Sequence, residues 1–248
     1  MSIQKQLISF AFEKAYPYIK EQLVIKDYLA QISFILVGSV ATGLCNANSD
    51  VDICLICDQK TFDIISEGTR WINGRPTEVI LDGKQLHYYA ISTDSLNKKI
   101  AEMDELALYV YGNAIIIDDT TGEYNRIAEK IHDSSLLFRR FDNEKDMLER
   151  RRRALYYVMK NDTDPMARME IGTEIMKRLL RCIALFDGRE FDSRKRFYQT
   201  ALLGPAGNEL KPKIDAMFLV LGPACRAENV KEANEFLELV DDCFDYFS

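Results

Sequence analysis

The fold of this chain is decided by two neighbouring stretches, Phe34-Ile-Leu-Val-Gly-Ser-Val-Ala-Thr-Gly43 and Asp50-Val-Asp-Ile-Cys-Leu-Ile56. In the first, an apolar run typical of a strand ends in a Gly-Ser turn. The second begins with two carboxylates one residue apart and continues as another apolar run. Side chains two apart on a strand point to the same face, with α-carbons about 6.6 Å from each other. The pattern therefore places Asp50 and Asp52 on one side of a sheet.

The paired carboxylates predict a cation site beside an anion site. Unpaired, Asp50 and Asp52 would repel each other, whereas a hard divalent cation that prefers oxygen ligands stabilises both, which favours Mg²⁺. The Gly38-Ser39 turn leads into a predicted helix, whose first N–H groups attract anions. A simpler explanation is a tight turn, with Gly38 and Gly43 at positive φ and Asp50 capping it. The combination of all these features favours a triphosphate site.

A third carboxylate follows in a predicted hairpin. Sites that hold two metal ions for phosphoryl chemistry usually contain a further acidic ligand. Glu78 interrupts an apolar run early in the first hairpin strand, so we expect it to complete the site, although an exposed position on an edge strand would explain it too. Asp82 is explained more simply as the turn residue before Gly83.

Hydrophobic periodicity predicts a mixed α/β (α+β) domain at residues 1–134, followed by a helical bundle at residues 135–248. The expected strands are 32–37, 51–57, the two hairpin strands 76–81 and 84–91, and 114–117. The helices expected around this sheet are 3–15, 19–28, 60–69, 93–103 and 124–131. Those expected in the bundle are 142–160, 164–186, 210–221 and 229–247.

Composition limits the classes of protein. The 248 residues carry a net charge of -7, with 47% hydrophobic and 29% charged residues, which is ordinary for a globular protein. The negative charge disfavours a long nucleic acid as the main partner, although the middle of the chain is basic. Neither a signal peptide nor a run long enough to span a bilayer is recognisable, so a cytoplasmic location without membrane contact is expected. Nothing in the sequence specifies an oligomeric state.

The cysteines and histidines do not suggest a further metal site. Cys54 and Cys57 lie three apart on a predicted strand, where their side chains point to opposite faces. All six cysteines are therefore expected to be free thiols. The two histidines, His87 and His132, have no partner at metal-ligand spacing, and we assign both to ordinary surface or hairpin packing.

The apolar strand, Gly38-Ser39, Asp50-x-Asp52 and a later strand with Thr77-Glu-Val together resemble the nucleotidyltransferase-fold superfamily, which shares its core with DNA polymerase β. Within it, the chain looks most similar to bacterial enzymes that adenylylate aminoglycosides and lincosamides. The specific motif covers residues 34–81. More loosely, residues 111–122 resemble the last core strand of the family.

The resemblance implies that residues 1–134 are the catalytic domain and residues 135–248 bind substrate or nucleotide. It implies that Asp50, Asp52 and Glu78 are catalytic and hold Mg²⁺, with two ions expected. Gly38 and Ser39 would hold the phosphates of ATP or another nucleoside triphosphate. In the second domain Lys195, with Arg194 as the alternative, would reach the triphosphate, and either residue would otherwise be a solvated side chain at a helix start.

The implied reaction transfers a nucleoside monophosphate, most simply AMP, to a hydroxyl group of a small molecule and releases pyrophosphate. Antibiotics are candidate acceptors, and resistance a candidate role. Glu78 is one candidate for the general base, and Glu170 and Glu174, one helical turn apart, are others. The alternatives are transfer to RNA or protein, as in toxin–antitoxin or defence systems, and a non-catalytic nucleotide-binding module. Arg150 to Arg153 span a full helical turn and are expected to be mostly solvated.

Overall fold

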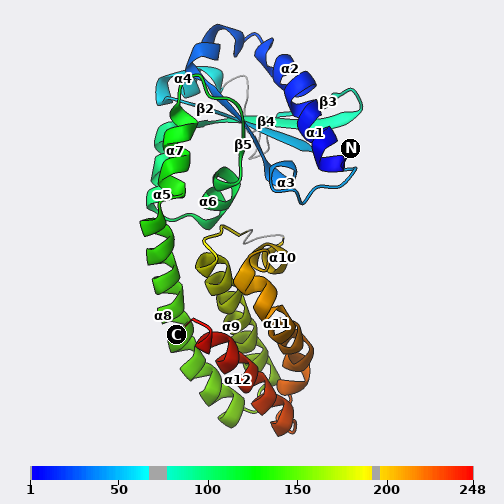
Figure 1. The fold of residues 1–248 in the computed structure, drawn as a ribbon, viewed down its shortest axis with the longest axis vertical. Coiled ribbons are helices and arrows are strands. Elements are labelled where there is room, and N and C mark those ends of the chain that lie inside the picture. The colour runs from blue at the N-terminus through cyan, green and yellow to red at the C-terminus, as the bar shows by residue number, and fades with distance from the viewer. Residues whose placement is uncertain (1, 67–76, 192–195, 248) are drawn as a thin grey trace. The chain divides into compact units, whose positions relative to one another are not determined.

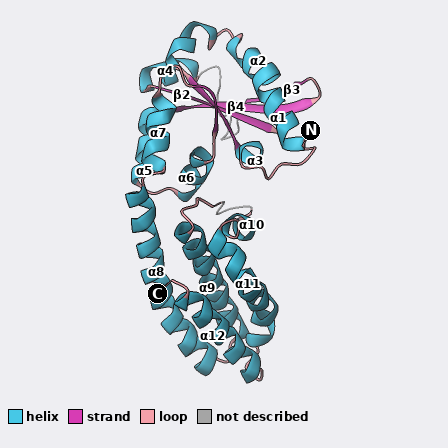
Figure 2. Cartoon of the chain, viewed as in Figure 1, coloured by secondary structure: helices cyan, strands magenta, loops and turns pink. Residues whose placement is uncertain are grey.

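The computed structural model describes residues 2–66, 77–191 and 196–247 of the chain. The chain divides into two compact units, Met1–His132 and Asp133–Ser248. The first unit contains the sheet and the second is helical (Figures 1 and 2). No helix in these described ranges is both long and apolar enough to cross a membrane.

The first unit is built on a mixed five-stranded sheet with the strand order β3-β4-β2-β1-β5. Strands β2 and β4 are parallel, whereas every other neighbouring pair is antiparallel. The strands are β1 (Ser33–Val37), β2 (Val51–Cys57), β3 (Thr77–Leu81), β4 (Lys84–Ser92) and β5 (Ile115–Asp118). The expected α/β architecture is therefore confirmed.

One face of the sheet is covered by the N-terminal helical segment. It comprises α1 (Ile3–Phe10), a π-helical turn η1 (Ala11–Ala15) and α2 (Tyr16–Lys20) (Figure 1). The buried side chains of this segment pack in one cluster with those strand residues that point to the same face. They are Leu7, Ala11, Ala15 and Ile19 from the helices, and Phe34, Leu36, Ile53 and Leu55 from β1 and β2. Alternation along β2 consequently turns Asp52 and Cys54 to the opposite face.

That opposite face is covered by later helices. They are α5 (Thr93–Ala101), α6 (Glu105–Gly112) and α7 (Glu123–Ile131). Tyr111 of α6 contacts the sheet through Tyr89 of β4, their hydroxyl oxygens lying 3.4 Å apart. Tyr124 of α7 donates to the backbone carbonyl of Tyr111. The tyrosines thus join two helices to the face of the sheet that carries Asp52.

Cys54 and Cys57 lie on opposite faces of β2, as expected from their spacing. Cys57 packs in the cluster below the N-terminal helices, whereas Cys54 interacts with Tyr89 and Tyr111. Burial raises the pKa of both thiols, that of Cys57 to about 12. All six cysteines of the chain are free. Both strand thiols therefore stay protonated near neutral pH, which argues against a nucleophilic role.

The second unit consists of α8 (Ser134–Asn161), α9 (Pro165–Phe186), α10 (Phe197–Ala201), α11 (Pro205–Ala224) and α12 (Val230–Asp245). Their apolar faces form one core, with Leu148, Leu155, Leu179, Ile214 and Phe236 buried in it. Asp187, directly after α9, accepts hydrogen bonds from the backbone N–H groups of Ala206 and Gly207. This carboxylate therefore caps α11, which begins at Pro205 instead of the expected residue 210.

Several expected elements differ from those observed. The helix expected at 19–28 is replaced by α2, which ends at Lys20, and a 3₁₀ helix, η2 (Lys26–Gln31). The bundle helix expected to start at residue 142 starts at Ser134, where Asp133 accepts a hydrogen bond from the backbone N–H of Ser135. Helix α6 was not expected at all. Tyr111 and Gly112 belong to its last turn, and not to the final core strand, which begins at Ile115.

Truncating the core of the sheet should destabilise the protein strongly. Leu55 is fully buried on β2, so Leu55→Ala removes apolar contacts and leaves a cavity. We expect it to lower the free energy of unfolding by about 2–5 kcal/mol, measured by urea denaturation. Leu23→Ala is the matched control, because Leu23 is 77% exposed. It should change stability by no more than about 0.5 kcal/mol, and equal losses in both variants would contradict this description of the core.

Candidate active site

The Gly-Ser turn brings the backbone close to Asp52. Gly38 follows β1 directly, has a φ of +73°, and opens the short helix α3 (Gly38–Ala41). A β-carbon built on Gly38 would overlap the Oδ2 atom of Asp52. Only glycine therefore combines the left-handed backbone with room for this carboxylate. Ser39, half-buried beside it, uses its carbonyl to accept hydrogen bonds from the backbone of Leu44 and the hydroxyl of Thr42.

The two carboxylates stand where β1 and β2 pair. Asp52 is the second residue of β2 and lies opposite Val37, the last residue of β1. Asp50 lies two residues earlier, just before the strand. The expected proximity of the Gly-Ser turn to the Asp-x-Asp motif is thus a direct consequence of the antiparallel register of these two strands.

A histidine on the neighbouring strand β4 lies beside Asp50 and Asp52, so that the polar side chains form a row across the sheet. His87 of β4 is the register partner of Asp52 in the parallel pair β2–β4. Its Nδ1 atom lies 3.0 Å from Asp50 Oδ2 and 3.3 Å from Asp52 Oδ1. The expectation that His87 has no partner at metal-ligand spacing is therefore wrong, because its partners come from another strand and not from nearby sequence.

Glu78 lies at the outer end of the same row. It pairs in register with His87 across the β3–β4 hairpin, and its Oε1 lies 3.8 Å from His87 Nε2. Its side chain is half-exposed, at 50%. We call Asp50, Asp52, Glu78 and His87 the carboxylate–histidine cluster. In this structure the His87 ring lies between Glu78 and the two aspartates.

The donor atoms of this cluster suit a divalent cation. One ligand atom each from Asp50, Asp52 and His87 lies within 4.8 Å of the others. Carboxylate oxygens are the preferred ligands of Mg²⁺ and Mn²⁺, and imidazole nitrogen is accepted by the first-row transition metals. The cluster can therefore hold one ion between Asp50 and Asp52.

Other expected site residues are placed less completely. Lys195 and Arg194 lie outside the residues that the structure describes. Glu174 belongs to α9 and forms salt bridges with Arg151, at 3.0 Å, and with Arg178, at 3.2 Å. Glu170 is exposed on the same helix.

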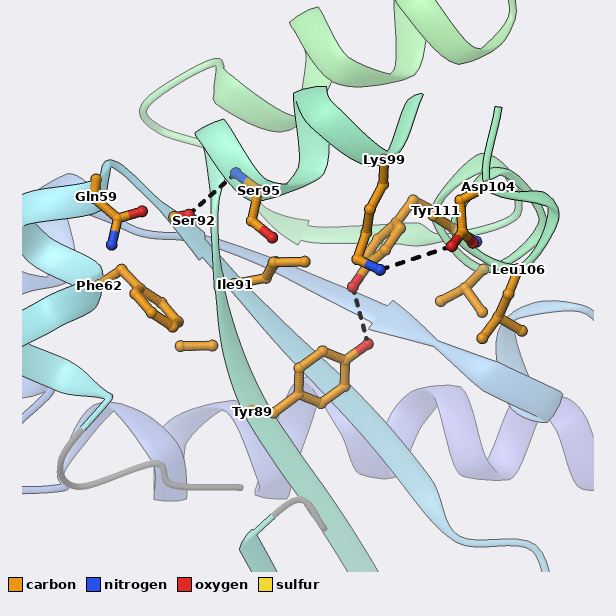
Figure 3. A pocket seen from close by; sticks show the side chains of 13 residues that line it. Gln59, Phe62, Tyr89, Ile91, Ser92, Ser95, Lys99, Asp104, Leu106 and Tyr111 are labelled. Carbon is orange, nitrogen blue, oxygen red and sulfur yellow. Dashed lines mark hydrogen bonds and ion pairs between the residues drawn. The ribbon is translucent and has the colours of Figure 1, made fainter. Parts of the chain in front are cut away.

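A cavity of about 590 Å³ opens on the face of the sheet that carries the cluster. Tyr89 and Ile91 line it and follow His87 along β4 at two-residue intervals, so all three side chains share one face. The remaining walls come from α4 (Gln59–Ile65), α5 and α6. Phe62 and Leu106 are among their residues (Figure 3), as is Val110. The cavity is thus mainly apolar and lies within the first unit.

Several polar side chains also line this cavity, and some of them are paired with each other. Lys99 Nζ lies 3.8 Å from Asp104 Oδ2, and the Tyr89 hydroxyl lies 3.4 Å from that of Tyr111 (Figure 3). Burial raises the pKa of both tyrosines, so their hydroxyls remain neutral hydrogen-bonding groups. The cavity therefore offers a ligand an apolar surface together with paired tyrosine hydroxyls and one ion pair.

Residues 19–112 match the model of a protein family described as the nucleotidyltransferase domain. The match includes the Gly-Ser turn and the whole carboxylate–histidine cluster. A comparison with curated proteins gave no match. This match supports the nucleotidyltransferase superfamily, as the resemblance predicted. The matched domain identifies the protein as a transferase of nucleotidyl groups, a class that uses a nucleoside triphosphate and a divalent metal ion.

The close approach of Gly38 to Asp52 generates a prediction. Gly38→Ala should displace the Asp52 side chain in addition to straining the backbone, so we expect weaker binding of Mn²⁺ in an isothermal titration. Gly122→Ala is the matched control, because Gly122 has a φ of +69° and no atom near its missing β-carbon. The control should cost about 1–2 kcal/mol of stability but keep the affinity for Mn²⁺. Equal affinities in both variants would contradict a special role of Gly38.

Proposed function

We propose that this enzyme transfers AMP from ATP to a hydroxyl group of a small molecule, with antibiotics among its acceptors. The observation that carries the proposal is the meeting of the Gly38-Ser39 turn with Asp50 and Asp52 in one row of the sheet. Backbone N–H groups at the turn suit phosphate oxygens, and the carboxylates suit a divalent ion that binds the same phosphates.

In the proposed reaction, an acceptor hydroxyl oxygen attacks the α-phosphorus of the nucleotide. A new P–O bond forms as the bond to pyrophosphate breaks, and the hydroxyl proton passes to a general base. Asp50 and Asp52 hold the ion, while Gly38 and Ser39 hold the phosphates. When bound, the divalent ion supplies polarisation of the phosphoryl oxygens and neutralises the charge on the leaving group. Glu78 completes this acidic site or accepts the proton.

The apolar cavity supports a small-molecule acceptor. Its volume of about 590 Å³ lies within the usual range of small-molecule pockets, about 300–1,000 Å³. Tyr89 lies two residues beyond His87 on the same face, which separates their α-carbons by about 6.6 Å. An acceptor in the cavity would thus need to extend only a short distance to present a hydroxyl group at the cluster.

Ion pairs in the second unit weigh against RNA as the acceptor. The basic run 150–153 would be the natural phosphate-binding segment. However, Arg151 pairs with Glu174, Arg152 with Glu149 and Asp241, and Arg153 with Glu149. Because carboxylates already neutralise these guanidinium groups, RNA binding there would have to break several ion pairs.

Removing either aspartate should abolish transfer. We expect Asp50→Asn and Asp52→Asn to reduce label transfer from α-³²P-ATP by at least about a hundredfold, because each loses a charged ligand of the ion. The assay contains MgCl₂ and a panel of aminoglycosides, lincosamides, tRNA and cell lysate. Asp63→Asn, at an exposed position on α4, is the matched control and should retain activity. Full transfer by Asp52→Asn would contradict the proposed site, and labelling of tRNA alone would contradict the proposed acceptor class.

Filling the cavity should impair acceptor binding selectively. Val110 is half-buried in its wall, so Val110→Trp is expected to raise the KM for the acceptor identified in that panel and leave the Kd for ATP unchanged. Lys98→Trp adds the same ring on the exposed side of α5 and should change neither constant. An unchanged acceptor KM in Val110→Trp would show that the acceptor binds elsewhere.

A further inference from the structure

His87 faces carboxylates with both of its ring nitrogens. Nδ1 points between Asp50 and Asp52, at 3.0 and 3.3 Å, while Nε2 lies 3.8 Å from Glu78. The ring is largely buried, with 12% of its side chain exposed. Nε2 itself is buried and has no hydrogen-bond partner within the described residues. One imidazole thus separates the two aspartates from the glutamate.

This position suits a metal ligand as well as a hydrogen-bond donor. Neighbouring ligands in a six-coordinate site, each about 2.1 Å from the ion, lie about 3 Å from each other. The separations of Nδ1 from Asp50 Oδ2 and Asp52 Oδ1 match this spacing. Without an ion, an Nδ1–H group can donate to the carboxylates. With an ion, the neutral ring can offer the Nδ1 lone pair and keep its proton on Nε2.

Glu78 is positioned to stabilise the tautomer of His87 that carries its proton on Nε2. A histidine that binds a metal almost always donates its other N–H to a carboxylate, carbonyl or water. Glu78 Oε1 is the carboxylate nearest to Nε2, and it belongs to the strand that pairs with β4. A small rotation of the half-exposed Glu78 side chain would bring Oε1 from 3.8 Å to within hydrogen-bond distance of Nε2.

We propose that His87 Nδ1 is a third ligand of the divalent ion held by Asp50 and Asp52, and that Glu78 positions the His87 ring through Nε2–H. The proposal rests on the function inferred above and refines its metal requirement. Imidazole favours Mn²⁺ and Co²⁺ over Mg²⁺, which prefers oxygen ligands. The site therefore discriminates for Mn²⁺ against Mg²⁺ more strongly than its carboxylates alone would.

The test measures metal binding without nucleotide or acceptor. Free Mn²⁺ is followed by electron paramagnetic resonance during titration of tag-free protein, and Mg²⁺ affinity is obtained by competition. We expect His87→Gln to weaken Mn²⁺ binding about tenfold or more while leaving Mg²⁺ binding nearly unchanged. Glu78→Gln should weaken Mn²⁺ binding less than His87→Gln. His132→Gln is the matched control, because His132 is the other of the two histidines in the chain.

Spectroscopy of the wild-type protein can test whether His87 binds the ion, and it does not depend on the folding of a His87 variant. Pulsed electron paramagnetic resonance of the Mn²⁺ complex should show coupling to an imidazole nitrogen in the wild type and in His132→Gln, and none in a folded His87→Gln. Absence of nitrogen coupling in the wild type would overturn the proposal. So would an equal loss of Mn²⁺ and Mg²⁺ affinity in His87→Gln, since that indicates a ring that merely orients the aspartates.

The aspartate variants separate this proposal from the proposed function. If Asp50→Asn and Asp52→Asn abolish Mn²⁺ binding while His87→Gln binds normally, only the role of His87 fails. If the aspartate variants bind Mn²⁺ as the wild type does, the ion lies elsewhere and the proposed active site fails with it.

Discussion

The cross-strand register of the sheet is the constraint on which the candidate active site depends. Antiparallel pairing of β1 with β2 puts Val37 opposite Asp52 and leaves Gly38 against the carboxylate. Parallel pairing of β2 with β4 puts His87 beside Asp52, and the hairpin adds Glu78. Because backbone hydrogen bonds fix these positions, Asp52, His87 and Glu78 are held together by the strands themselves, and Asp50 lies directly before β2.

Local sequence patterns predicted well where Asp50 and Asp52 lie on the sheet, and which strands form the first unit. The bounds of β2, the Asp82-Gly83 hairpin turn and the shared face of Asp50 and Asp52 follow from alternation and turn chemistry. The Gly-Ser turn was recognisable for the same reason. The family match over residues 19–112 confirms the superfamily, while the likeness to aminoglycoside and lincosamide enzymes stays a prediction.

His87 illustrates why the remaining part of the site could not be predicted from the sequence. Its partners lie 35 and 37 positions earlier in the chain, so the search for ligands at short sequence spacing missed it. A usable signal was present, since Leu86, Tyr88 and Ala90 form the buried face of β4 and leave His87 on the other. Combining that alternation with β2–β4 pairing would have placed it beside Asp52. Similarly, the ion pairs of Arg151 and Arg152 depend on helix packing, which a run of arginines does not reveal.

The hairpin that joins Glu78 to His87 limits how the length of this segment can vary. Its turn consists of Asp82 and Gly83, both with positive φ, and adding or deleting a single residue in either strand would slip one strand against the other. His87 or Glu78 would then project toward the N-terminal helices, and the cluster would be lost even if the hairpin still folded. Viable insertions in β3 or β4 should therefore come in pairs or be absorbed by a bulge, so that the length of this hairpin is constrained by chemistry as much as by stability.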